Sequence, residues 1–235
     1  MKRKIAIGIL IIDIILCIYS SYQIIKWNID NKKTSNIIQK INIISKEETK
    51  KDKTISIDFN SLLNINNEVV GWIKVKNTNI NYPILKHNDN DYYLTHSFDK
   101  SINSAGWIFM DYRNNENNLD NNTIIYGHGR KDGTMFGSLF KVIKKEWYTN
   151  KDNLDIDLTT LNNSYTFNIF SIYVINTTDD YININYNEEI LNKVVNRSIY
   201  NFNTNVDLND KILTLSTCYN NEKKIVIHAK LIYNN

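Results

Sequence analysis

Cysteine is scarce in this sequence, with Cys17 and Cys218 the only two among 235 residues. Histidine is equally sparse, and the four histidines lie far apart, at positions 87, 96, 128 and 228. A zinc site needs Cys or His ligands at short, regular spacing, and a disulfide framework needs several cysteine pairs. Neither pattern is present, so the sequence predicts a protein that uses no metal and no other cofactor.

Proline and glycine are scarce as well, at one and seven residues. Glycine adopts backbone conformations that other residues avoid, so it marks tight turns and close approaches of the backbone. Five of the seven lie in one middle stretch: Gly106, Gly127, Gly129, Gly133 and Gly137. We therefore expect the turns that need glycine to be concentrated there.

Neither sign of charge is in large excess. The chain has 28 Lys and Arg against 25 Asp and Glu, a formal net charge of +3. Nucleic-acid-binding domains concentrate basic residues on one face or segment, whereas here they are dispersed, so no nucleic acid is predicted as a partner. The hydrophobic content of 42% excludes a fully disordered chain.

The N-terminus contains a long apolar stretch, residues 5–25, preceded by three basic residues. Its length matches the roughly 20 residues that cross a bilayer as a helix. Asp13 near its middle costs about 2.5–3.5 kcal/mol on insertion, and the ten Ile and two Leu gain about 4–7 kcal/mol together. Insertion is therefore favoured. The alternative, a cleaved signal peptide, lacks an A-x-A-like cleavage site.

Basic residues before a membrane span stay in the cytoplasm, which predicts the topology. We expect residues 1–27 to form the cytoplasmic N-terminus and a single-pass anchor in the cell membrane, with the rest extracellular. Cys218 is then the only extracellular thiol. A lone cysteine in a secreted domain is either a reactive thiol or a buried inert one, and the count alone favours neither.

Residues 28–53 are polar, but Ile37, Ile38, Ile41 and Ile44 recur at helical spacing. This pattern predicts an N-terminal helix that begins near Ser35 or Asn36, and a solvated linker is the alternative.

From residue 54 onward the pattern is mostly that of short strands, rich in β-branched and aromatic residues and bounded by turn residues. Pro83 suggests that its strand lies at an edge or begins there. Helical spacing predicts only two helices, 135–143 and 188–202. Many strands with few helices indicate a mainly β fold with flanking helices, closed or sandwich-like. The predicted strands are 71–75, 80–84, 106–110, 123–126, 165–175, 211–215 and 225–232.

Cys218 and His128 are the candidates for chemistry. Cys218 ends an apolar strand, where a nucleophile is held rigidly and can face a cleft. A thiol that attacks an acyl carbon needs a partner that gives or takes a proton. His128 could be this partner, because it directly follows a predicted strand and has a glycine on each side. The 90 positions between them mean that only the fold can bring them together. A histidine beside glycine is often just a turn residue, so the residues alone leave this open.

The sequence also resembles the sortase family. Thr214–Cys218 (TLSTC) resembles the TLxTC signature, and Tyr126–His128 resembles the histidine motif of that family. Five further segments are similar to class B sortases and occur in the same order: Val70–Ile73 (VGWI), Asn90–Leu94 (NDYYL), Ala105–Arg113 (AGWIFMDYR), Asp132–Gly137 (DGTMFG) and Ile227–Leu231 (IHAKL).

The resemblance implies a sortase-type eight-stranded β-barrel over residues 54–235. It also implies a cysteine transpeptidase that cleaves an NPxTx-like C-terminal sorting signal of secreted proteins after Thr and transfers the acyl group to an amine of peptidoglycan or its precursor. Cys218 is then the nucleophile and His128 the proton donor. Ser216 and Thr217 are expected to contact substrate.

One position departs from the family, which places an Arg at the start of the strand after the cysteine. Lys224 occupies it here, and a Lys offers a point charge instead of a planar fork of donors. We expect Lys224 to replace the Arg in part, or Arg130 to reach the substrate instead; a solvated turn at 223–224 is the alternative. Two other functions stay open: a cysteine hydrolase, in which water instead of an amine resolves the thioacyl intermediate, and a catalytically weak module that binds sorting signals, which the missing Arg makes plausible.

Overall fold

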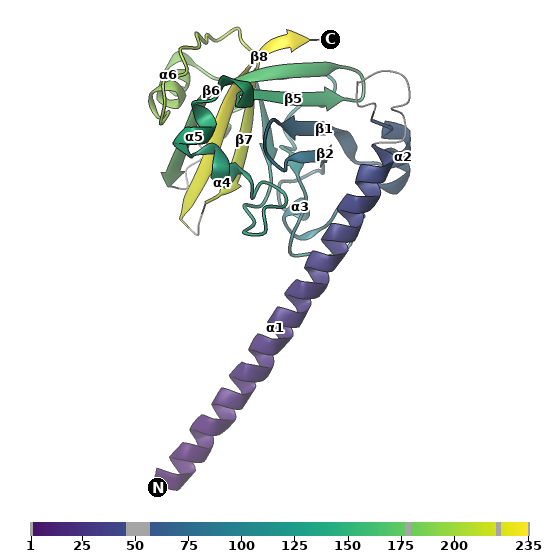
Figure 1. Ribbon diagram of the computed structural model, residues 1–235, viewed down its shortest axis with the longest axis vertical. Coiled ribbons are helices and arrows are strands. Elements are labelled where there is room, and N and C mark those ends of the chain that lie inside the picture. Colours follow the sequence, from purple (N-terminus) through teal and green to yellow (C-terminus); the bar gives the residue numbers. More distant parts are fainter. Residues whose placement is uncertain (1, 46–56, 177–179, 220–221, 235) are drawn as a thin grey trace.

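The computed structural model describes residues 2–45, 57–176, 180–219 and 222–234. Eight strands in these ranges form one closed barrel in the order β1-β2-β3-β4-β7-β8-β6-β5 (Figure 1). The predicted eight-stranded barrel with flanking helices is therefore confirmed. The strands are β1 (Val69–Val75), β2 (Asn81–Leu85), β3 (Phe109–Met110), β4 (Asn122–Tyr126), β5 (Asp155–Thr160), β6 (Ser164–Asn176), β7 (Ile212–Cys218) and β8 (Lys223–Asn234).

The helices are short except for the first. They are α1 (Lys2–Ile44), α2 (Phe59–Ile65), α3 (Tyr92–Thr95), α4 (Leu139–Val142), α5 (Lys145–Tyr148) and α6 (Glu188–Asn196), with 3₁₀ turns η1 (Lys151–Asn153) and η2 (Asp180–Ile182).

Two pairs of strands in the barrel are parallel, β2 with β3 and β4 with β7, and the other pairs are antiparallel. The β4–β7 pair matters for function because both strands end at the same rim of the barrel. Strand β7 is buried on both faces. Leu213 and Leu215 belong to the barrel core, and Ile212 packs into a second cluster with Leu191 and Val194 of α6. This explains why residues 212–217 are all buried and show no alternation of buried and exposed positions.

Several predicted boundaries are wrong. The predicted strand 106–110 is reduced to β3, because Gly106 turns the chain with φ +58°. The predicted helix 135–143 is reduced to α4, since Met135 has φ +51° and cannot be helical. The predicted helix 188–202 ends at Asn196, beyond which the Ile199 amide bonds the Ile172 carbonyl of β6. Strand β5 was not predicted.

Pro83 lies within β2 and pairs with Trp72 of β1, so it does not begin its strand. Strand β2 has a neighbour on each side in the closed barrel, but no residue of β3 pairs with Pro83 itself. Strand β3 reaches β2 only at Leu85. The Pro83 carbonyl instead accepts a hydrogen bond from the indole nitrogen of Trp107, at 3.0 Å. The Trp107 side chain, and not a neighbouring strand, covers this part of β2, so the missing N–H of Pro83 interrupts no backbone hydrogen bonds between strands there.

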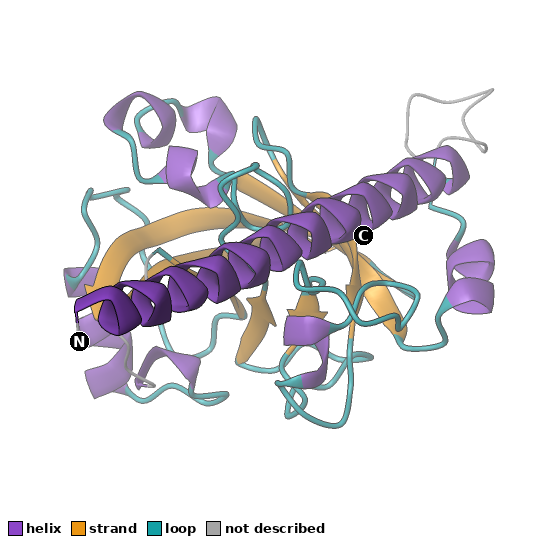
Figure 2. Ribbon diagram, turned by 90° about the horizontal axis from the view of Figure 1, so that it is seen from below, coloured by secondary structure: helices purple, strands orange, loops and turns teal. Residues whose placement is uncertain are grey.

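Helix α1 is continuous over 43 residues and does not begin at Ser35 or Asn36 (Figures 1 and 2). Its N-terminal part extends away from the barrel and exposes its isoleucines, whereas Asp30, Thr34 and Ile41 are buried against the domain. Residues 28–44 are therefore helical, and 46–53 lie outside the described residues. By length and composition, α1 is the one described helix able to cross a membrane.

Candidate active site

The β4–β7 pairing brings His128 and Cys218 together. Tyr126, the last residue of β4, is the parallel partner of Ser216 in β7. His128 and Cys218 each lie two residues further along, and neighbouring strands are about 4.8 Å apart. The loop after β4 also lies tightly against β7: a Cβ added at Gly129 would be 2.1 Å from the carbonyl oxygen of Cys218. Residues 90 positions apart in sequence thus share one rim of the barrel.

Lys224 lies beside the cysteine. It is the antiparallel partner of Cys218 in the β7–β8 pair, and its Nζ donates to the cysteine Sγ at 3.1 Å. The thiol is exposed, and the lysine is partly buried. The register of the two strands allows this contact, since directly opposite residues of antiparallel strands have Cβ atoms about 5 Å apart.

The His128 ring is held by the backbone of α3. Its Nε2 lies 2.7 Å from the carbonyl oxygen of Leu94. A carbonyl only accepts, so Nε2 bears the hydrogen of this bond and Nδ1 is the nitrogen left for proton exchange. Gly106 packs against the ring, since a Cβ there would lie 2.9 Å from both the His128 Cδ2 and the Leu94 oxygen.

These residues border a cleft of about 670 Å³. Its walls are mainly apolar and aromatic, as is usual for ligand sites, with few polar groups. The lining residues are Asn90, Leu94, Phe109, Tyr126, Gly127, His128, Tyr181, Ile182, Ser216, Thr217, Cys218 and Lys224.

Ser216 and Thr217 both line this cleft, as expected for residues that contact substrate. The Ser216 hydroxyl hydrogen-bonds the Tyr181 hydroxyl at 3.0 Å. Thr217 is 2% exposed, and its Oγ1 is buried without a hydrogen-bond partner among the described residues. Buried polar atoms are nearly always paired, so Thr217 Oγ1 is a vacant hydrogen-bonding group next to the cysteine.

Arg130 is not brought into the cleft. Its guanidinium donates to Asp132 and Thr134 in its own loop, the latter at 2.9 Å. It also donates to the Asn31 side chain of α1. Only 11% of the Arg130 side chain is exposed, so it has no freedom to swing toward Cys218 without breaking these bonds.

A hydrogen-bond network that the sequence did not reveal holds together several residues around the cleft wall. The buried Asp111 carboxylate accepts from Asn90, from Tyr126 at 2.9 Å and from Arg113. Burial alone would raise the pKa of Asp111, but the bonds from Arg113 and Tyr126 outweigh it and hold the pKa below its ordinary value. Arg113 also donates to the Ile182 carbonyl, at 2.9 Å, so it connects two lining segments. An acidic residue directly after the apolar run 107–110 was the available signal.

His228 lies in β8 but outside the cleft, fully buried, so it is a packing residue and not a surface one. It hydrogen-bonds the hydroxyls of Thr214 and Tyr173, each at 2.8 Å. Burial, with a smaller contribution from Arg197, lowers the pKa of His228 to about 3. It is therefore neutral at physiological pH and serves the structure.

Comparison with known proteins identifies the family of this chain. The family model of the sortase domain matches residues 73–232. Sortase B of Staphylococcus aureus is 33% identical over 99% of this chain and 98% of its own length. Sortase B of Listeria monocytogenes is 39% identical over 74% of each chain. A crystal structure of sortase B from Bacillus anthracis has a TM-score of 0.77 at 35% identity, covering 87% of this chain and 98% of that one. The chain therefore belongs to the sortase family, is similar to its class B members, and is a cysteine transpeptidase.

Proposed function

We propose that this protein is a membrane-anchored sortase that cleaves an NPxTx-like sorting signal after Thr and transfers the acyl group to a peptidoglycan amine. The observation on which the proposal rests is the placement of Cys218, His128 and Lys224 at one rim of the barrel, with the Lys224 ammonium 3.1 Å from the thiol sulfur. The apolar cleft beside them offers room for a short extended peptide.

In the first half-reaction the Cys218 thiolate attacks the Thr carbonyl carbon. The sulfur–carbon bond forms, and the carbonyl electron pair moves onto the oxygen. When this tetrahedral intermediate collapses, the carbon–nitrogen bond breaks and the amine leaves with a proton from His128 Nδ1. The thioacyl enzyme and the released C-terminal fragment are the products.

In the second half-reaction an acceptor amine enters. Its nitrogen attacks the thioacyl carbon, His128 takes the proton of the attacking amine, and the sulfur–carbon bond breaks. This restores the Cys218 thiolate and leaves an amide between the surface protein and the cell-wall amine. Water in place of the amine would give hydrolysis.

Lys224 takes the part of the family's arginine in this scheme. A cation beside sulfur stabilises the anionic form of the nucleophile, and the same charge favours the oxyanion. Arg130 supports the His128 loop instead, since its donors are bound to Asp132, Thr134 and Asn31. Thr217 lines the cleft beside the nucleophile, and Ser216 with Tyr181 shapes the cleft wall.

The apolar part of α1 anchors the enzyme. At 1.5 Å per residue, the 21 residues 5–25 span roughly 30 Å, the thickness of the hydrocarbon core. The barrel then lies outside the cell, where secreted proteins and the wall are accessible.

A panel of Thr-containing pentapeptides, incubated with the full chain with and without a peptidoglycan-type amine, tests the proposal. We expect cleavage after Thr in both cases and an amide product only when the amine is present. Alanine substitution of His128 should abolish turnover, whereas substitutions of His87 and His96, which lie outside the cleft lining, should not. The proposal would be refuted if the His128 variant reacted at the native rate, or if the same product formed with and without the amine.

A further inference from the structure

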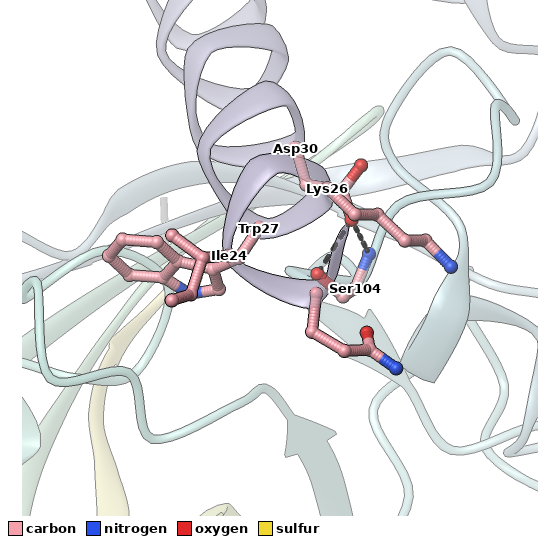
Figure 3. A pocket seen from close by; sticks show the side chains of 6 residues that line it. Ile24, Lys26, Trp27, Asp30 and Ser104 are labelled. Atoms are coloured by element: carbon pink, nitrogen blue, oxygen red, sulfur yellow. Dashed lines mark hydrogen bonds between the residues drawn. The ribbon is translucent and has the colours of Figure 1, made fainter. Parts of the chain in front are cut away.

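Among the residues of α1 that are buried against the domain, Asp30 and Thr34 lie one turn apart and are polar. Asp30 is 5% exposed, and its Oδ2 accepts hydrogen bonds from both the amide and the hydroxyl of Ser104, at 3.1 and 2.7 Å. Figure 3 shows Asp30 directed from the helix to Ser104 with both bonds drawn. A buried carboxylate with two donors is a specific attachment, because burying it unpaired would be costly.

The same turn holds the residue before Ser104. The Asn103 side-chain amide donates to the Thr34 hydroxyl at 3.0 Å and to the Asp30 carbonyl at 3.2 Å. The backbone N–H of Asn103 donates to the carbonyl oxygen of Thr95, at 2.8 Å. Segment 103–104 is thus fixed between α1 and the end of α3.

This segment leads directly to the catalytic histidine. Gly106, two residues after Ser104, packs against the His128 ring, and its amide donates to the Asn103 carbonyl at 3.0 Å. The next residue, Trp107, donates its amide to the Tyr93 carbonyl, at 2.8 Å. Leu94, whose carbonyl orients His128, lies between Tyr93 and the Thr95 that Asn103 holds.

A second contact joins α1 to the loop that bears His128. Arg130, two residues after His128, donates to the Asn31 side chain on the same turn of α1. Asp30 and Asn31 therefore support both the segment that orients the ring and the loop that bears it.

We propose that Asp30, with Asn31 and Thr34, is a positioning residue for His128, so that α1 is part of the catalytic framework as well as an anchor. The inference rests on the proposed role of His128 as proton donor. A proton donor displaced by as little as 1 Å loses on the order of 10²-fold in rate. The residues of α1 do not line the cleft, so binding of the peptide is expected to stay unchanged.

The test compares two substrates in single-turnover acylation of the full chain in detergent micelles, followed by intact mass. One is an NPxTx-type peptide with a scissile amide, and the other replaces that amide by an ester. An amine leaves only with a proton, whereas an alkoxide leaves far more readily without one. Loss of general-acid positioning therefore slows the amide selectively, and general misfolding slows both.

We expect Asp30→Ala to acylate from the amide about 10- to 100-fold more slowly and from the ester within about threefold of the native rate, with KM for the amide unchanged. Asn31→Ala, which removes a single contact, should show the same selectivity more weakly. Asp30→Asn keeps an oxygen acceptor for Ser104 and should restore most of the amide rate. Lys33→Ala, on an exposed position of the same helix, is the matched control and should equal the native protein.

His128→Ala in the same assay distinguishes failure of the positioning role from failure of the proposed function. If it is selectively slow on the amide while Asp30→Ala and Asn31→Ala behave like the native protein, the positioning role is refuted and the proposed function stands. If Asp30→Ala slows ester and amide equally, its role is only structural and the inference is also refuted. If His128→Ala is as fast as the native protein on the amide, both the proposed function and the inference fail.

Discussion

Replacing Lys224 by methionine removes the charge beside the nucleophile and keeps most of the side-chain volume. At 3.1 Å, opposite unit charges attract with about 1.3 kcal/mol in water and about 5 kcal/mol at an effective dielectric constant of 20. Because Cys218 is exposed, solvent screens the pair and the lower value applies. Removal of the lysine charge beside the thiolate should then lower the reactivity of the thiol about tenfold.

A second role predicts a larger effect. If the Lys224 ammonium also bonds the oxyanion, its loss should cost about 10²–10³ in acylation, as for other oxyanion donors. The assay therefore measures two rates in a Cys17→Ser background: alkylation of the thiol by iodoacetamide, and acylation by an NPxTx-type peptide. We expect Lys224→Met to reduce alkylation about tenfold and acylation at least tenfold more than that.

Two variants complete the experiment. Lys224→Arg should keep or raise the acylation rate, because a planar fork of donors suits an oxyanion better. Lys223→Ala is the matched control: adjacent residues of a strand face opposite sides, and Lys223 is exposed. If Lys224→Met and Lys223→Ala are equally active, the reasoning about the cationic group is wrong, and Cys218 and His128 act without it.

The remaining predictions concern the support of the site. Gly129→Ala places a methyl group 2.1 Å from the Cys218 carbonyl oxygen, so we expect the free energy of unfolding to fall by about 1–3 kcal/mol and the activity at least tenfold. Gly8→Ala is the control and should change neither, because its methyl group meets nothing within 4 Å. Equal melting temperatures of the native protein and both variants would contradict this prediction. His228 should make the fold acid-sensitive: the unfolded chain takes up a proton below about pH 6.5, but folded His228 does so only near pH 3, so stability falls as pH drops through that window. Urea unfolding at pH 7 and pH 5 measures the change in the free energy of unfolding. If this change is equally large in His228→Gln, another group is responsible.

The sequence predicted those features that depend on local pattern. The apolar run 212–215 and the strand around Tyr126 are correctly located, because alternation and β-branched residues determine them locally. Strand β5 was missed even though it alternates buried with partly exposed residues, since its Asp and Thr residues made the pattern too polar. The helix predicted at 135–143 failed because Met135 has a backbone conformation fixed by the surrounding turn.

The candidate site divides in the same way. Motif resemblance located Cys218 and His128, but their proximity follows from the parallel pairing of β4 with β7, which no local pattern encodes. The bond from Lys224 to the sulfur likewise depends on strand register. The role of Arg130 was left open, and in the structure its guanidinium donates to Asp132 and to Asn31 of α1 instead of lining the cleft. Asp30 gave no signal at all, since a single acidic residue on a polar helix is ordinary until its partner is known.

The central claim is that Cys218 forms the acyl bond to substrate. Intact mass spectrometry of the full chain, after incubation with NPxTx-type peptides and no amine, tests it most directly. We predict a mass increase equal to the fragment that ends in Thr less one water, mapped to Cys218, in the native protein and in Cys17→Ser. Cys218→Ala should show the unmodified mass and a native melting transition. An adduct that persists in Cys218→Ala, or that maps to any other residue, would contradict the account.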